Sequence, residues 1–122
     1  MASPKRKEAP TDRTFLVSDI SLLRQALGLT VLVRVGPGVR YREMKLQSPD
    51  RIVVDIPNSR LAVPPEQRQQ KVNHSIVRTV RASQFQIDPA VSRIVLDVTS
   101  IPRYEIRSVP SGLEIRVLGG KP

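Results

Sequence analysis

Hydrophobic and polar residues alternate in short runs along most of this 122-residue chain. Within residues 29–35, 51–56 and 93–98, every second position holds leucine, isoleucine or valine. A period of two places these side chains on one face of a β-strand, which predicts strands that are buried on one side. Turn-forming residues such as proline, glycine and aspartate separate the runs at intervals of about 8–12 residues. This pattern is typical of an all-β sandwich or barrel.

The second half of the chain repeats the first. Val31–Val35 lie 63 residues before Ile94–Val98, and Tyr41 lies the same distance before Tyr104. After the tyrosines the offset falls to 61 residues. Self-similarity of this kind indicates one domain built by internal duplication. We therefore predict an all-β sandwich of two related, roughly four-stranded sheets, in which the apolar face of one copy packs on that of the other.

Composition sets the expected boundaries. Residues 1–13 are polar and without periodicity, which predicts a disordered tail. The β domain is expected at 14–118, with copies at about 14–57 and 76–118, a connection at 58–75 and a short tail at 119–122.

Three segments depart from simple alternation. Hydrophobic residues recur at helical spacing within residues 20–28, and a glycine ends the run, which predicts one short helix near 20–28. Residues 40–46 predict a strand with a bulge, because Tyr41 and Met44 fall out of phase. The connection is expected to be irregular, with one short helical turn after Pro65.

The chain is strongly basic, with a formal net charge of +9 and a sequence pI of about 11.1. Residues 1–13 hold four cations and two acids, which leaves 16 cations against 9 acids, a net charge of +7, in the rest. A basic surface indicates an anionic partner, such as nucleic acid, lipid headgroups or an acidic cell-wall polymer. Nucleic acid is the less favoured of these, because the chain has only two tyrosines and two phenylalanines for base stacking.

Several functional classes are disfavoured. The chain has no cysteine, so disulfides, thiolate zinc sites and thiol nucleophiles are excluded. No apolar run approaches the roughly 18 residues of a membrane span, and the N-terminus lacks the apolar core of a signal peptide. Either the protein stays where it is made or the chain is part of a longer exported protein, and we favour the second interpretation.

The residues offer little to catalysis. His74, the only histidine, is expected to lie exposed in the connection, and no metal-binding or nucleophile motif surrounds it. Asp55 and Asp97 occupy outward strand positions and are expected to form surface charge pairs rather than a catalytic dyad. We therefore predict no enzyme activity, no cofactor and no metal site.

Arginine is the abundant functional residue type. A guanidinium group binds carboxylate or phosphate through two parallel hydrogen bonds, which lysine cannot match. The densest segment, IVRTVRASQFQ at 76–86, nominates Arg78, Arg81 and Gln84 as ligand-binding residues, with Arg51 and Arg93 as second choices.

Four segments in order resemble the AMIN domain: PDRIVVDIPN at 49–58, IVRTVRASQF at 76–85, RIVLDV at 93–98, and the closing segment from Tyr104 to Val117. The resemblance covers roughly residues 14–118. It implies a non-catalytic β-sandwich of the periplasm or cell envelope that binds peptidoglycan and targets an attached amidase or secretin module, for example to the division septum. The alternative is a protein-interaction module, in which a strand edge or the 58–75 connection docks a secretin, pilus or divisome component.

Overall fold

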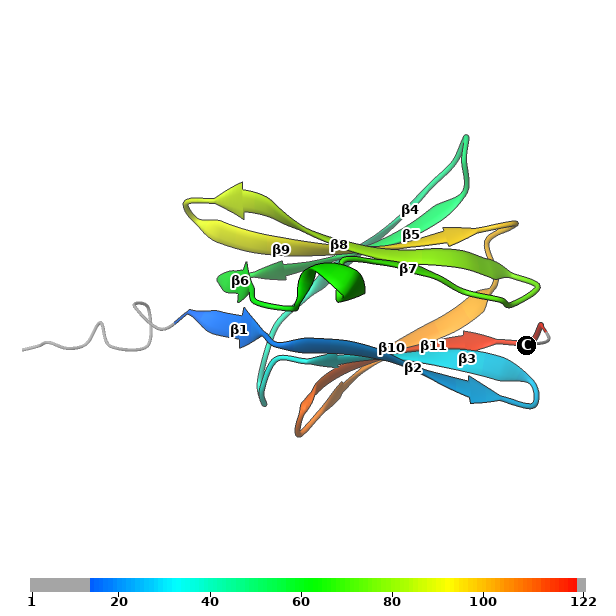
Figure 1. Cartoon of the computed structure of the whole chain (residues 1–122), viewed down its shortest axis with the longest axis horizontal. Helices are drawn as coiled ribbons and strands as arrows, with labels where there is room; N and C mark the ends of the chain where they lie inside the picture. Colours follow the sequence, from blue (N-terminus) through cyan, green and yellow to red (C-terminus); the bar gives the residue numbers. More distant parts are fainter. Residues whose placement is uncertain (1–13, 121–122) are drawn as a thin grey trace, which may run out of the picture.

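Residues 14–120 form a sandwich of two antiparallel sheets in the computed structural model, which describes these residues (Figure 1). The tail expected at 1–13 and residues 121–122 lie outside the described part. The elements in order are β1 (Phe15–Val17), β2 (Asp19–Gln25), β3 (Gly28–Arg34), β4 (Arg42–Leu46), β5 (Arg51–Pro57), β6 (Ser59–Leu61), the 3-10 helix η1 (Pro65–Gln67), β7 (Gln69–Lys71), β8 (Val77–Ile87), β9 (Ala90–Val98), β10 (Arg103–Val109) and β11 (Gly112–Leu118). The predicted all-β sandwich is confirmed.

Each sheet combines one hairpin from each copy of the repeat. The four-stranded sheet has the order β10-β11-β3-β2, and the five-stranded sheet has the order β4-β5-β9-β8-β7. Val31 lies opposite Ile115 in the first sheet, and their equivalents Ile94 and Val54 lie opposite each other in the second. The duplication is therefore preserved down to strand register, as a pseudo-twofold relation between the sheets.

The combination of hairpins from both copies in each sheet corrects the expectation that each copy forms its own sheet. Alternation determines which face of a strand is buried, but it does not specify which strand lies beside it. In the folded chain the central strands β3 and β11 come from different copies, and so do β5 and β9. The two copies therefore share both sheets.

The helix predicted near 20–28 is a strand instead. β2 pairs with β3 from Asp19 to Gln25, and Ile20 is buried. Gly28 does not end a helix. It lies beside β11, where a Cβ atom would sit 2.6 Å from the carbonyl oxygen of Val117. Because pairing with β3 and side-chain amides from the connection satisfy backbone groups of this segment, tertiary context overrides its helical spacing.

An aliphatic core fills the space between the sheets. Both sheets contribute side chains that are almost fully buried, including Ile20, Leu29 and Ile115 from one and Ile52, Ile94 and Leu96 from the other. The core explains the alternation, because these are the predicted inward positions.

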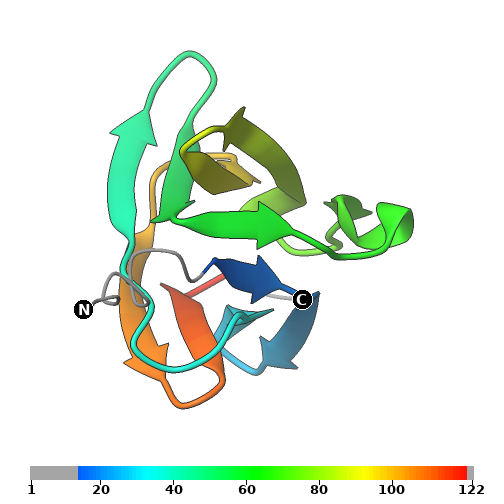
Figure 2. The same cartoon turned by 90° about the vertical axis from the view of Figure 1, so that its left-hand side faces the viewer.

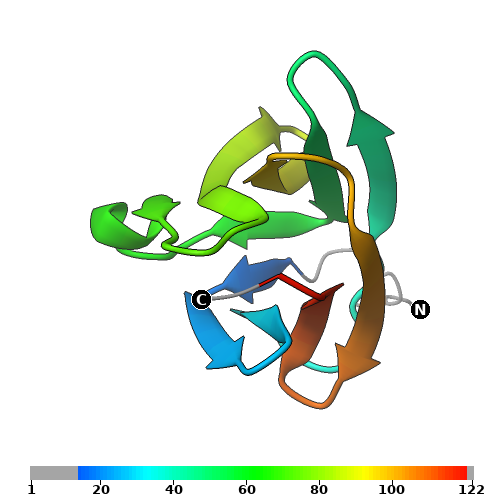
Figure 3. The same cartoon turned by 90° about the vertical axis from the view of Figure 1, so that its right-hand side faces the viewer.

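The connection between the copies seals one side of the sandwich, whereas β4 and β10 border the opposite side (Figures 2 and 3). The predicted helical turn after Pro65 is confirmed as η1. The Gln67 side chain accepts the backbone N–H of Ile20 at 2.8 Å and donates to Asp19 Oδ1 at 2.8 Å. Gln70 donates to the carbonyl of Ile20 at 3.0 Å. These amides satisfy the N–H and carbonyl groups of Ile20 on the β2 edge, and β7 pairs with the β8 edge.

Candidate ligand-binding face and cleft

The outer face of the five-stranded sheet gathers three of the five predicted ligand-binding residues. Because side chains alternate along a strand, Arg51 on β5, Arg81 on β8 and Arg93 on β9 all face away from the core. Arg51 lies opposite Asp97, and Arg93 lies opposite Asp55. We call these five residues the arginine face.

An ion pair and a cation–π contact orient Arg93. Its Nε and Nη2 atoms donate to the two carboxylate oxygens of Asp55 at 2.8 and 2.9 Å. Its guanidinium carbon lies 3.5 Å from the centre of the Phe85 ring. The pair to Asp55 is well shielded, because the Arg93 side chain is only 22% exposed and that of Asp55 is 10% exposed. The guanidinium group is held in one plane, and within residues 14–120 the pair with Asp55 takes two of its five N–H groups.

Asp97 organises the second half of the arginine face. Arg81 donates to both of its oxygens, from Nε at 2.7 Å and from Nη2 at 2.9 Å, and the Thr79 hydroxyl also bonds to it. Burial by itself would raise the pKa of Asp97, but the hydrogen bonds from Arg81 and Thr79 and the charges of Arg81 and Arg51 outweigh it and lower the pKa. The carboxylate therefore stays ionised and fixes Arg81, whose side chain is 44% exposed. The expected pairing of Asp55 and Asp97 with arginines across the sheet is confirmed, but Asp55 is buried rather than at the surface.

The other two nominated residues lie elsewhere. Arg78 is exposed at an irregularity in the β8–β9 pairing, beside Lys71 and His74. Gln84 is committed to the fold, because its side chain accepts the N–H of Leu61 at 2.7 Å and donates to three backbone carbonyls. With its amide used in this way, Gln84 acts as a structural crosslink to β6.

His74 is buried, which corrects the expectation of an exposed loop histidine. Its Nδ1 atom accepts the N–H groups of Ile76 and Val77 at 3.1 and 3.3 Å. Gly120 packs on the ring, since a Cβ atom there would lie 2.5 Å from His74 Cε1. Burial, with a smaller contribution from the charge of Arg24, lowers the pKa of His74. The imidazole is thus a neutral structural element that joins the connection to the end of the domain.

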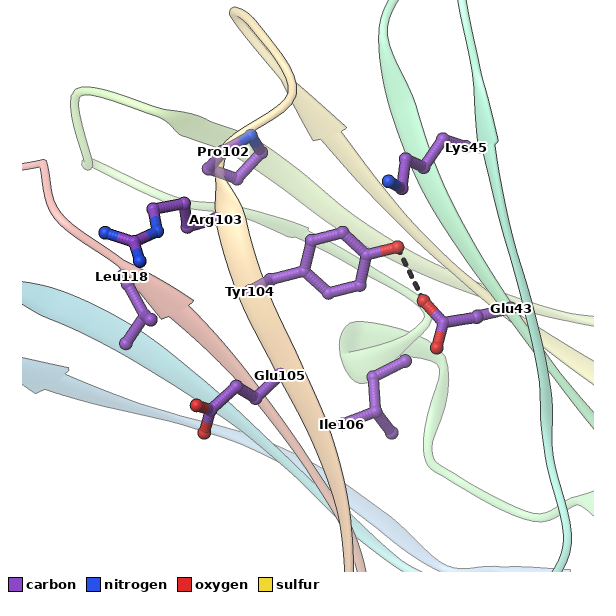
Figure 4. A pocket seen from close by; sticks show the side chains of 8 residues that line it. All are labelled: Glu43, Lys45, Pro102, Arg103, Tyr104, Glu105, Ile106 and Leu118. Carbon is purple, nitrogen blue, oxygen red and sulfur yellow. Dashed lines mark hydrogen bonds between the residues drawn. The ribbon is translucent and has the colours of Figure 1, made fainter.

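A solvent-open cleft of about 670 Å³ lies where β10 and β4 border the open side of the sandwich. Tyr104 projects from β10 toward β4 and donates its hydroxyl hydrogen to Glu43 Oε2 at 2.6 Å (Figure 4). Lys45 Nζ lies 5.9 Å from the centre of the Tyr104 ring. Burial, together with the hydrogen bond to Glu43 and its charge, raises the pKa of Tyr104 to about 12. The phenol is therefore a neutral donor at any physiological pH.

The sequence analysis missed this cleft, although its signal was present. In β4 the positions facing the core side are Glu43 and Lys45, opposite Val54 and Ile52, whereas Met44 faces outward. The pairing of β4 with β5 runs without interruption, so the predicted bulge is wrong. Polar residues at apparently inward positions mean either that the inward and outward positions were assigned the wrong way round, or that the strand borders a cleft at the sheet edge. Here the strand borders a cleft.

The described residues limit other chemistry. Within residues 14–120, no group of three or more histidine, aspartate or glutamate side chains is arranged to hold a metal ion. No helix in this part of the chain has the length and apolar character needed to cross a bilayer.

Comparison with models of protein families matches residues 19–117 to the AMIN domain. The match extends from the start of β2 almost to the end of β11 and so takes in both copies of the repeat. No curated protein matches the chain.

Proposed function

Because this chain belongs to the AMIN domain family, we propose that it is a non-catalytic domain that binds peptidoglycan and localises an attached amidase or secretin module in the cell envelope. The arginine face is the observation that carries the proposal. It presents three cations against two carboxylates, and each of those carboxylates is already paired with an arginine. The spare guanidinium donors are suited to the carboxylates of peptidoglycan stem peptides.

Pairing with aspartate prepares these arginines for binding. A free arginine loses rotamer freedom when it binds a ligand, whereas Arg81 and Arg93 are already held by Asp97 and Asp55. Because each pair uses one edge of the guanidinium group, the other edge remains available to a ligand. The face therefore favours planar anions over a diffuse negative charge.

Co-sedimentation with purified sacculi tests this proposal. We expect the wild-type protein to pellet with sacculi at low salt and to be released as salt rises, because exposed charges are screened beyond about 10 Å at 0.1 M. Full retention in the supernatant at low salt contradicts wall binding. If a secretin or pilus component binds the protein while sacculi do not, the protein-interaction alternative replaces the proposal.

A charge-neutral double variant separates a specific face from general basicity. Arg81→Gln combined with Asp97→Asn removes one cation and one anion, so the net charge is unchanged. We expect sacculus affinity to fall about tenfold, which corresponds to loss of one bidentate contact. Arg107→Gln with Glu114→Gln makes the same change between paired strands of the other sheet and serves as the matched control. Equal losses in both double variants contradict the assignment to the arginine face.

A further inference from the structure

The cleft between β4 and β10 holds polar groups that the fold does not require. The pseudo-twofold relation places Tyr41 as the equivalent of Tyr104, and its hydroxyl donates to the carbonyl of Ile106 at 3.2 Å. Position 43 is equivalent to position 106, because they lie opposite the equivalent residues Val54 and Ile115. The two tyrosines therefore make matching contacts across the same opening. In one contact the partner is a backbone carbonyl, and in the other it is the carboxylate of Glu43.

The two halves of this opening differ in their side chains. Where one half has Glu43 and Lys45, the other has Ile106 and Ser108 at the equivalent positions. The half with Ile106 shows that a tyrosine can bridge the opening through a backbone carbonyl, without a charged partner. Besides their contacts with Tyr104, Glu43 and Lys45 keep hydrogen-bonding groups that can serve a ligand.

The composition of the cleft differs from that of the arginine face. Two acids, Glu43 and Glu105, balance two cations, Lys45 and Arg103, so the cleft gives no net attraction to an anion. Apolar surface comes from the Tyr104 ring and Ile106. An aromatic ring among hydrogen-bonding groups suits a ligand that is neutral, has an apolar face and carries hydroxyl or amide groups at its edges.

We propose that this cleft binds the uncharged sugar backbone of a polysaccharide, with a sugar ring against Tyr104 and its hydroxyl or amide groups on Glu43 and Lys45. Glu43 keeps one carboxylate oxygen and further lone pairs for sugar hydroxyls, and Lys45 supplies ammonium donors. The cleft is open to solvent rather than enclosed, so a continuing polymer chain can pass through it.

This inference deepens the proposed function and rests on it for the identity of the polymer. β4 separates the two sites: Glu43 and Lys45 face the cleft, and β5, whose Arg51 belongs to the arginine face, is its direct neighbour. One polymer can therefore place its sugar backbone in the cleft and its acidic side groups on the arginine face.

Titration of the wild-type protein with an uncharged oligomer of N-acetylglucosamine, followed by ¹H–¹⁵N NMR, tests the inference. The oligomer has no carboxylate, so it isolates the cleft from the arginine face. We expect shift changes centred on residues 43–45 and 103–106, with a dissociation constant in the millimolar range (about 1 mM). An absence of shifts, or shifts centred on another surface, overturns the inference.

Matched tyrosine variants provide the control. Tyr104→Ala should weaken binding about tenfold, whereas Tyr41→Ala, the same truncation at the equivalent position, should leave the affinity within about twofold of wild type. Glu43→Gln keeps the ring and should weaken binding about fivefold, which keeps the inference testable if Tyr104→Ala does not fold. Equal losses in the two alanine variants would show that both tyrosines act only through the fold.

Sacculus binding by the wild-type protein is scored separately. Retention by sacculi without oligomer binding rejects the sugar cleft and leaves the proposed function standing. Oligomer binding in the cleft without retention by sacculi rejects peptidoglycan as the polymer instead.

Discussion

Each side of the sandwich is bordered by two equivalent strands, β2 with β8 and β4 with β10, but the two sides have opposite chemistry. On the β2 and β8 side lies the connection (Figure 2), whose neutral glutamine amides bond to the N–H and carbonyl groups of Ile20 on the edge strand. On the β4 and β10 side, Tyr41 and Tyr104 span the gap. Charged side chains line the cleft around Tyr104 (Figure 4). The comparison teaches that duplication placed equivalent strands at each side, and that the single-copy connection made one side structural.

The two sides also protect their edges differently. An uncovered strand edge can pair with another chain, and proteins prevent this by covering the edge or by placing charges on it. The connection covers the first side, whereas Glu43, Lys45, Arg103 and Glu105 mark the second with charge. The same charges that discourage strand addition are available to a ligand.

The largest effect is expected at Gln84 on the closed side. Gln84→Ala removes the acceptor for the N–H of Leu61 and a donor to carbonyls including those of Ser59 and Val91. Unpaired, part-buried backbone groups predict a loss of about 2–4 kcal/mol in the free energy of unfolding. Urea denaturation measures it. Gln86→Ala, at an exposed neighbour, should stay within about 0.5 kcal/mol of wild type, and a similarly small change for Gln84→Ala would contradict its structural role.

A smaller loss is expected where the connection meets β2. Gln67→Ala removes the acceptor for the N–H of Ile20 and the donor to Asp19. We expect the free energy of unfolding to fall by about 1–3 kcal/mol in the same denaturation experiment. Gln69→Ala, two residues away on the exposed face of β7, is the control. If both variants match wild type, the glutamines do not seal this side.

On the closed side, the protonation of His74 should make the free energy of unfolding depend on pH. Because its pKa is lowered in the folded state, the unfolded chain binds a proton that the folded chain excludes. Stability is therefore complete above the unfolded pKa of about 6.5 and falls as the pH drops below it, by at most about 1.4 kcal/mol per pH unit. Unfolding curves between pH 7.5 and 5.5 should show this slope in wild type and not in His74→Gln. Parallel curves for the two proteins would count against it.

The smallest effects on stability are expected from the hydroxyl hydrogen bonds of Tyr41 and Tyr104 on the open side. Tyr104→Phe and Tyr41→Phe each remove one hydrogen bond and should cost about 0.5–1.5 kcal/mol. In the Tyr41→Phe protein, the remaining phenol should show little phenolate absorbance at about pH 10.5, because the pKa of Tyr104 is about 12. Glu43→Gln in that background should increase phenolate at the same pH. Ionisation near the ordinary tyrosine pKa in both proteins would show that Glu43 does not hold Tyr104.

Alternation and repetition made much of the fold predictable. The inward residues of β3, β5 and β9 were identified because burial on one face imposes a period of two. The pairing of Asp55 and Asp97 with arginine was predictable because both lie at outward positions of neighbouring strands. The backbone bonds of Gln84 were not predictable for a physical reason: a side-chain amide looks the same in sequence whether it serves the backbone or a ligand.

The sequence by itself determined an all-β duplicated domain, its aliphatic core and its excess of arginine, because these depend on local periodicity and composition. Only the tertiary structure decided that the copies exchange hairpins, that His74 is buried and that Tyr104 meets Glu43 across an open edge. Such facts depend on which strands become neighbours. Pairing between distant strands is chosen by the packing of the whole core, and no local pattern encodes it.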